Sequence, residues 1–109
     1  MSADEIHRRF RGLIRSGLLG VGERLPTVRQ TAGDFGVAPG TAARAYRRLE
    51  EEGLVVTRTA AGTRVAATAG ALPAPVVRRI RQLVDDARSA RVDLDELVDV
   101  LRLTWSRVV

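Results

Sequence analysis

Residues 25–49, LPTVRQTAGDFGVAPGTAARAYRRL, decide the fold. Thr27 follows a proline and has a glutamine three residues on, a capping box that predicts the start of a short helix. Gly36 is expected to end that helix after two turns, and Pro39 stands at the permissive first position of a second helix over about 39–52. Two helices joined by so short a turn are typical of a helix-turn-helix.

The second of these helices has two different faces. Its apolar residues recur at the i, i+3, i+4 and i+7 spacing of a buried stripe: Ala42, Ala45, Tyr46 and Leu49. Its polar and basic residues are Thr41, Arg44, Arg47 and Arg48. Arg48 can pair along the helix with Glu52, four residues on, whereas Arg44 has no such acid. We therefore expect one face to pack in the core, Tyr46 included, and the other to remain available for a partner.

The residues on either side complete one small domain. Ser2 has a glutamate three residues on, a second capping box, and the apolar spacing that follows predicts a helix over about 3–16. Residues 54–59 and 63–66 are rich in β-branched side chains and flank a short turn, which predicts a two-stranded hairpin, or wing. The predicted fold class is mainly α with a small β-hairpin, a winged helix-turn-helix domain over residues 1–68.

The last third of the chain predicts a separate helical region. Residues 69–75 have no periodicity and two prolines, which is typical of a linker. Two amphipathic helices are expected over 76–109, the second opened by a capping box of Asp93 and Glu96. Their apolar stripes carry Val77, Ile80, Leu83, Val84, Leu94, Leu97, Val98, Leu101 and Trp105. Two short helices cannot bury both stripes against each other, so we expect a dimerisation arm whose partner is a second copy of the chain.

Composition narrows the possible partners. The formal net charge is +5, all 18 basic residues are arginine, and residues 1–66 hold 11 of these against 7 acids. Arginine suits phosphate and guanine, although exclusive arginine use also fits a GC-rich genome and a solvated surface. The absence of cysteine excludes disulfides and thiolate metal sites. No apolar run is long enough for a membrane helix and the first residues are acidic, so we expect a cytoplasmic protein with no membrane contact.

The sequence offers no catalytic or metal-binding constellation. The single histidine, His7, is expected on an exposed stretch of the first helix, with no second histidine or cysteine to complete a metal site. Acidic clusters at 85–86 and 93–96 fall at expected helix ends, where solvation and capping account for them. We therefore predict that the chain is not an enzyme and needs no cofactor.

Several motifs stand in a fixed order along the chain. They are Leu25-Pro26-Thr27-Val28-Arg29, Gly36-Val37-Ala38-Pro39-Gly40-Thr41, Arg44-Ala45-Tyr46-Arg47-Arg48-Leu49-Glu50, Glu52-Gly53-Leu54-Val55 and Gly62-Thr63-Arg64-Val65. Together they resemble the GntR family of bacterial regulators, and Pro39, the Ala45-Tyr46 pair and the short tail most resemble its YtrA subfamily. The resemblance implies a cytoplasmic homodimeric repressor that binds double-stranded DNA at an inverted-repeat operator.

In a helix-turn-helix the second helix enters the major groove with its first turns facing base edges. Thr41 and Arg44 are therefore predicted base readers, with phosphate or solvent contact the alternative for Arg44. The resembled family has an arginine contacting DNA at the position of Arg29, while Thr27 can contact a phosphate or serve only as a cap. Arg64 in the wing can enter a narrow minor groove or be a solvated strand residue. The full predicted DNA-binding set is Thr27, Arg29, Gly40, Thr41, Arg44, Arg48, Thr59, Gly62, Thr63 and Arg64, with Arg58 as a further phosphate contact.

Some positions depart from the family pattern. Ala38 and Gly40 stand where relatives often have polar side chains that cap the recognition helix and touch DNA. In the wing, Ala60 and Arg64 stand where many relatives have a second glycine and an aromatic residue. These departures keep open a rival in which the winged helix binds another protein. A crevice beside Trp105 in the dimer could also hold a small apolar effector.

Overall fold

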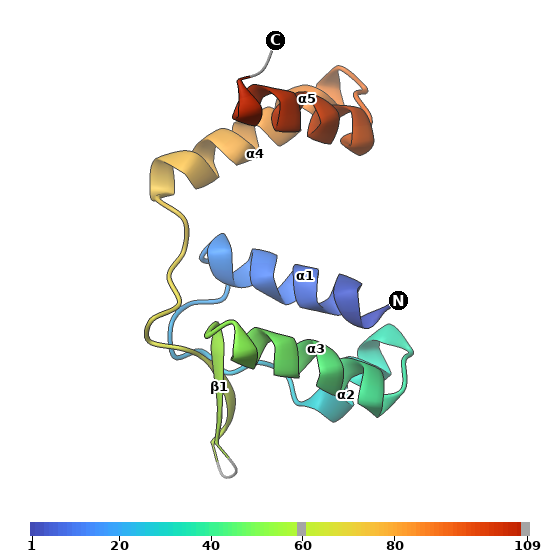
Figure 1. Ribbon diagram of the computed structural model, residues 1–109, viewed down its shortest axis with the longest axis vertical. Helices are drawn as coiled ribbons and strands as arrows, with labels where there is room; N and C mark the ends of the chain where they lie inside the picture. Colours follow the sequence, from blue (N-terminus) through green and yellow to red (C-terminus); the bar gives the residue numbers. More distant parts are fainter. Residues whose placement is uncertain (59–60, 108–109) are drawn as a thin grey trace. The chain divides into compact units, whose positions relative to one another are not determined.

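The structure, a computed structural model, describes residues 1–58 and 61–107. Its elements are α1 (Ala3–Arg15), α2 (Val28–Phe35), α3 (Pro39–Glu51), β1 (Val55–Arg58), β2 (Gly62–Val65), α4 (Ala74–Ser89) and α5 (Leu94–Ser106). Figure 1 shows the hairpin of β1 and β2 projecting away from the three N-terminal helices. The predicted fold class is confirmed: the chain is mainly α, with one small hairpin as the wing of a helix-turn-helix.

The chain divides into two compact units, Met1–Leu72 and Pro73–Val109. The first unit extends beyond the hairpin: Ala69 is 3% exposed and belongs to its core. A little further on, the Leu72 amide donates to the Arg15 carbonyl at 2.7 Å. The start of the segment expected to be a linker is therefore fastened to the first unit.

Local signals set the helix ends in the first unit. The side chains of Ser2 and Thr27 each accept a hydrogen bond from the backbone amide of the residue three positions later, Glu5 and Gln30 respectively. The side chains of these later residues accept in turn from the backbone amides of Ser2 and Thr27. Gly36 ends α2 in the left-handed conformation, at φ 64°, which glycine adopts without strain. Ala38 gives α3 no side-chain cap, and Pro39 sets its first residue. These signals confine α2 and α3 to the lengths that a helix-turn-helix requires.

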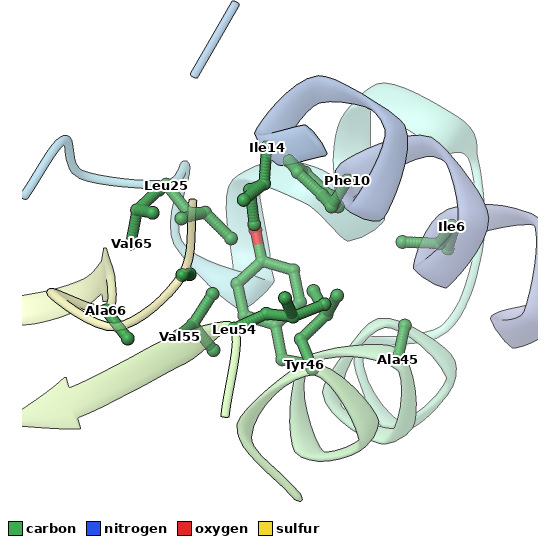
Figure 2. Close-up of a cluster of buried hydrophobic side chains, with 12 residues drawn as sticks. Ile6, Phe10, Ile14, Leu25, Ala45, Tyr46, Leu54, Val55, Val65 and Ala66 are labelled. Atoms are coloured by element: carbon green, nitrogen blue, oxygen red, sulfur yellow. The ribbon is translucent and has the colours of Figure 1, made fainter. Parts of the chain in front are cut away.

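The core of the first unit lies between α1, α3 and the hairpin. Its buried side chains form one cluster: Ile6, Phe10, Ile14, Leu25, Ala45, Tyr46, Leu49, Leu54, Val55, Val65, Ala66 and Ala69. Figure 2 shows the ring of Tyr46 inside this cluster. The ring of Phe10 meets it edge-on, with 5.4 Å between the ring centroids and 82° between the planes. Tyr46 is thus a core residue, as its place on the apolar stripe predicts.

The hydroxyl of Tyr46 connects α3 to the start of α2. It donates to the Pro26 carbonyl at 2.6 Å and lies 2.7 Å from the hydroxyl of Thr31, which is buried. Buried polar groups need such partners, because an unpaired one costs about 1–3 kcal/mol. Burial also raises the pKa of Tyr46 above its ordinary value of 10.0, because the phenolate would lose its hydration, and the Thr31 hydrogen bond opposes this effect more weakly.

His7 is buried, which corrects the expectation that it is exposed. It follows Ala3 by four residues and precedes Phe10 by three, so it lies on the face of α1 that packs against the core. Its Nε2 atom contacts the carboxylate of Glu52, and this hydrogen bond is the main reason why the pKa of Glu52 is lowered. The contact fastens the C-terminal end of α3 to α1.

The hairpin is buried at its base and more exposed toward its turn. β1 and β2 pair antiparallel, with Val55 opposite Val65 at the base of the ladder and Arg58 opposite Gly62 near the turn. Val55 and Val65 are buried in the core cluster, whereas Arg58 is exposed. Burial in the hairpin is therefore confined to its base, and the two-stranded hairpin that the β-branched segments predict is present.

An extended segment before α2 also pairs with β2. The Leu25 amide donates to the Thr63 carbonyl at 2.8 Å, and Arg24 stands opposite Arg64 in an antiparallel bridge. Nothing in the local sequence predicts this pairing, because about 40 residues separate the partners and the segment contains two glycines. It places Arg24 at the root of the wing.

The second unit consists of α4 and α5, and none of its described residues is buried. α4 begins at Ala74, with Pro73 as its N-cap and Pro75 in its first turn, where proline is tolerated. Asp93 is the N-cap of α5, but its side chain makes no capping hydrogen bond. The capping box predicted for Asp93 and Glu96 is therefore wrong: only the extended backbone of a cap is present.

Replacing Tyr46 with phenylalanine should destabilise the first unit by about 1–3 kcal/mol, because the Pro26 carbonyl and the Thr31 hydroxyl lose their buried partner. Urea unfolding followed by circular dichroism measures the change. Adding Thr31→Val should restore part of the loss, since the second unpaired hydroxyl is then removed as well. A Tyr46→Phe protein as stable as the wild type would contradict this role of the hydroxyl.

Tyr46 is the only tyrosine of the chain, so the ultraviolet absorbance of tyrosinate reports its ionisation alone. The midpoint in the folded protein should lie above 10.0, and the free energy of unfolding should fall as the pH rises past 10.0, because the unfolded chain then loses the proton first. The same titration in urea gives the reference midpoint. Equal midpoints in the two states would mean that the ring is not desolvated.

Candidate nucleic-acid interface

The two predicted base readers lie side by side at the start of α3. Arg44 is exposed, and its Nη2 atom lies 3.5 Å from the Oγ1 atom of Thr41, one turn earlier on the helix. Thr41 is half-buried, so its hydroxyl is a fixed point against which the guanidinium can rest. The remaining N–H groups of Arg44 have no acceptor among the described residues, and they are free to meet a ligand.

Before Thr41, the first turn of α3 offers backbone groups and no polar side chain. Ala38 forms no side-chain cap, and a β-carbon built on Gly40 would find no atom within 4 Å. The amides of a first helical turn have no partner inside the helix, and they attract anions. The loss of side chains at these positions therefore leaves the Gly40 amide open to a phosphate.

The start of α2 is basic and borders a hollow. Thr27 uses its hydroxyl oxygen to accept from the Gln30 amide at 3.0 Å, so it caps α2. Arg29, in the first turn, is exposed. A hollow of about 810 Å³ runs along this helix and is lined by Arg24, Leu25, Pro26, Thr27, Arg29, Gln30, Gly33 and Asp34.

The predicted wing residues have different surroundings. Gly62 begins β2 with φ 71°, and the hydroxyl of Thr63 lies 3.1 Å from that of Thr57 across the ladder. Arg64 is exposed but folds back along the sheet, where it donates to the Gly22 carbonyl at 3.1 Å. Thr59, also in the predicted set, lies outside the described residues.

Arg48 stands apart from the other predicted contacts. Its guanidinium pairs with the carboxylate of Asp4 on α1 and not with Glu52, the partner expected along α3. Glu52 is instead taken by His7, because α1 packs along α3 and brings its own side chains to this position. The charge of Arg48 is thereby matched within the protein.

Arg24 is the basic residue that the sequence reasoning missed. It is exposed, lines the hollow beside α2 and sits at the root of the wing. In the sequence it is one arginine in a glycine-interrupted segment, which no periodicity distinguishes from a solvated side chain. Only the pairing with β2, which the local pattern does not encode, gives it a defined place.

In the second unit, the predicted dimerisation residues remain accessible. Val77, Leu97 and Val98 are half-buried, and the exposed members are Ile80, Leu83, Val84, Leu94, Leu101 and Trp105. Trp105 is 87% exposed. A hollow of about 420 Å³ is lined by Val98, Leu101, Arg102 and Trp105.

Residues 1–58 and 61–107 lack two kinds of feature. No group of three or more histidine, cysteine or acidic side chains there is placed to hold a metal ion. No helix within these ranges is long and apolar enough to cross a membrane.

The chain is similar to proteins named as transcriptional regulators. It is 56% identical over 50 residues to the HTH-type transcriptional regulator Rv1152 of Mycobacterium tuberculosis, a match that covers 46% of this chain and 41% of that protein. It is 29% identical over 99 residues to the HTH-type transcriptional repressor YtrA of Bacillus subtilis, which covers 86% of this chain and 76% of the relative. Among solved structures, YtrA from Sulfolobus acidocaldarius, a GntR-family transcription factor, matches with a TM-score of 0.57 at 26% identity, over 81% of this chain and 85% of that one.

The family model for bacterial regulatory proteins of the gntR family matches residues 2–65, more than half of the chain. This family and the relatives named above are regulators and not enzymes, which confirms the prediction that the chain is not an enzyme. The winged helix-turn-helix described above is the part of the chain that the family model covers. The chain therefore belongs to the GntR family of bacterial regulatory proteins, and it resembles the YtrA regulators within that family.

Proposed function

We propose that this protein is a sequence-specific DNA-binding transcriptional regulator that acts as a homodimeric repressor at an inverted-repeat operator. The observation that carries the proposal is the start of α3, where the exposed Arg44 lies beside Thr41 and its other N–H groups have no partner in the described part of the chain. In a helix-turn-helix this is the end of the recognition helix that enters the major groove. Membership of the GntR family supports DNA binding in the bacterial cytoplasm, and the name repressor for the YtrA relative supports the direction of regulation.

Arg44 is the base reader in this proposal. A guanidinium can bind the O6 and N7 atoms of one guanine at the same time, which discriminates against other bases by about 1–3 kcal/mol. Arg29 and the amide of Gly40 would contact phosphates, and such contacts fix the position of the protein on the duplex without reading sequence. Arg48 contributes little, because Asp4 already matches its charge.

The second unit supplies the proposed dimer contact. Its exposed valines and leucines and Trp105 form an apolar surface that is stable in water when another surface covers it. A second copy can cover it with two-fold symmetry, and such a dimer presents two recognition helices to half-sites of opposite orientation. We therefore assign DNA binding to the first unit and dimerisation to the second. The boundaries predicted from the sequence are 1–68 for the DNA-binding domain, 69–75 for a linker and 76–109 for the dimerisation region. An effector would bind beside Trp105, in the hollow lined also by Val98 and Leu101.

Arg44→Ala should lower the affinity for the operator by about tenfold to a hundredfold and should relax the preference at one base pair, because the contact to guanine is lost. The operator is first selected from a pool of random duplexes with the wild-type protein, and affinities are then measured by fluorescence anisotropy. Arg29→Ala should weaken operator and non-operator duplexes alike, as expected for a phosphate contact.

Arg8→Ala is the matched control, since it removes an exposed arginine from α1 in the same unit. Operator binding by Arg44→Ala equal to that of the wild type would mean that α3 does not read bases. Binding of the wild type that is absent, or that does not weaken with salt, would favour the alternative in which the winged helix binds another protein.

Leu101→Asp should convert the dimer into a monomer, because it buries a charge in the proposed apolar contact. Analytical ultracentrifugation at micromolar concentration measures the mass. Leu18→Asp is the control, since Leu18 is also an exposed leucine but belongs to the first unit. A wild-type protein that is monomeric under these conditions would overturn the dimer.

A further inference from the structure

The outer face of the hairpin gathers arginines around one glycine. Arg24 stands opposite Arg64 in the bridge to β2, and Gly62 stands opposite Arg58 in the ladder to β1. Residues opposite each other, and residues two apart on one strand, have their side chains on the same face of a sheet. Arg24, Arg58 and Arg64 therefore share one face, and all three are exposed.

The guanidinium of Arg24 lies directly on Gly62. A β-carbon built on Gly62 would be 2.8 Å from the Nε atom of Arg24, 3.0 Å from Nη2 and 3.2 Å from Cζ. Any other residue would push the guanidinium away, and it would also be strained at the positive φ of this position. Gly62 thus both forms the turn into β2 and provides the space in which Arg24 rests.

The charge of Arg24 has no counter-ion in the described part of the chain. None of the ion pairs found there includes it. The neighbouring acid, Glu23, is turned away and accepts from the Gly20 amide at 3.1 Å. Arg64, on the same face, is engaged with the Gly22 carbonyl. Arg24 is therefore a positioned cation that the protein leaves unmatched.

Arg24 also shares a space with the basic start of α2. It lines the hollow of about 810 Å³ together with Thr27 and Arg29, while Asp34 lines it from the last turn of the helix. Arginines from two separate segments thus line one hollow, in which Asp34 is the single acid. A DNA backbone carries phosphates in a regular row, and it can meet both cations as it passes between the wing and α2.

We infer that Arg24 is a DNA-backbone contact, held by Gly62 at the root of the wing so that one phosphate lies between it and Arg29. This inference rests on the proposed function and adds to it a residue outside both the recognition helix and the hairpin. The contact is to phosphate, so Arg24 strengthens binding to any duplex and does not read sequence.

The test uses full-length protein and a duplex of mixed sequence, titrated over a series of salt concentrations. Arg24→Ala should lower the affinity by about tenfold and should reduce the slope of log affinity against log salt by about 0.9, the value for one lost phosphate contact. Arg24→Lys should keep the slope, because it keeps the charge. The control Arg8→Ala should leave both quantities unchanged, and thermal unfolding confirms that each variant is folded.

Gly62→Ala tests how Arg24 is held. It should weaken DNA binding in the wild-type background but should add little to the loss in Arg24→Ala, because both changes remove the same contact. An unchanged affinity and slope in Arg24→Ala, in a protein that otherwise binds DNA with a steep salt dependence, would overturn the inference and leave the proposed function standing. A wild-type protein that does not bind DNA would overturn the proposed function itself.

Discussion

The hydrogen bond from the Tyr46 hydroxyl to the Pro26 carbonyl, with the Thr31 hydroxyl beside it, is the constraint on which the proposed DNA-binding face depends. α2 has eight residues, of which Thr31 and Ala32 are buried, while Val28 and Phe35 are only partly buried against the core. Tyr46 stands two residues after Arg44 on α3, and the carbonyl that it binds directly precedes the cap of α2 at Thr27. One buried interaction therefore sets the separation between the proposed base reader and the proposed phosphate contacts. α1 and the hairpin close around the same ring, so the core and the binding face share a single anchor.

Much of the fold can be predicted because its signals are local. The capping boxes at Ser2 and Thr27, the left-handed Gly36 and the proline at the start of α3 each act within a few residues, and the structure contains all of them. The neighbouring positions of Thr41 and Arg44 follow from helix periodicity alone. One local signal, at the start of α5, is not realised in full. Asp93 has the sequence and backbone of a cap, but its side chain does not complete the hydrogen bond.

The features that the sequence could not reveal all depend on contacts between distant segments. The arginines around His7 in the sequence suggest a surface residue. In the structure α1 packs on α3, and the His7 ring contacts the carboxylate of Glu52. The same packing gives Arg48 an acid from α1 in place of the one four residues along its own helix. Arg24 acquires a defined position only because its segment pairs with β2. In each case the deciding partner is about 40 residues or more away, and composition gives no hint of it.

Gly40 leaves a space without a side chain in the first turn of the proposed recognition helix α3. A β-carbon built there would meet no atom within 4 Å, and the backbone of Gly40 is not in the left-handed region that favours glycine. Glycine in a helix is less stable than alanine by about 0.5–1 kcal/mol, so many replacements would stabilise α3 while adding a new group toward the ligand. On the proposed function, a single replacement at Gly40 would therefore change the group that faces DNA and leave the core untouched. In evolutionary terms, such a position can vary without loss of stability.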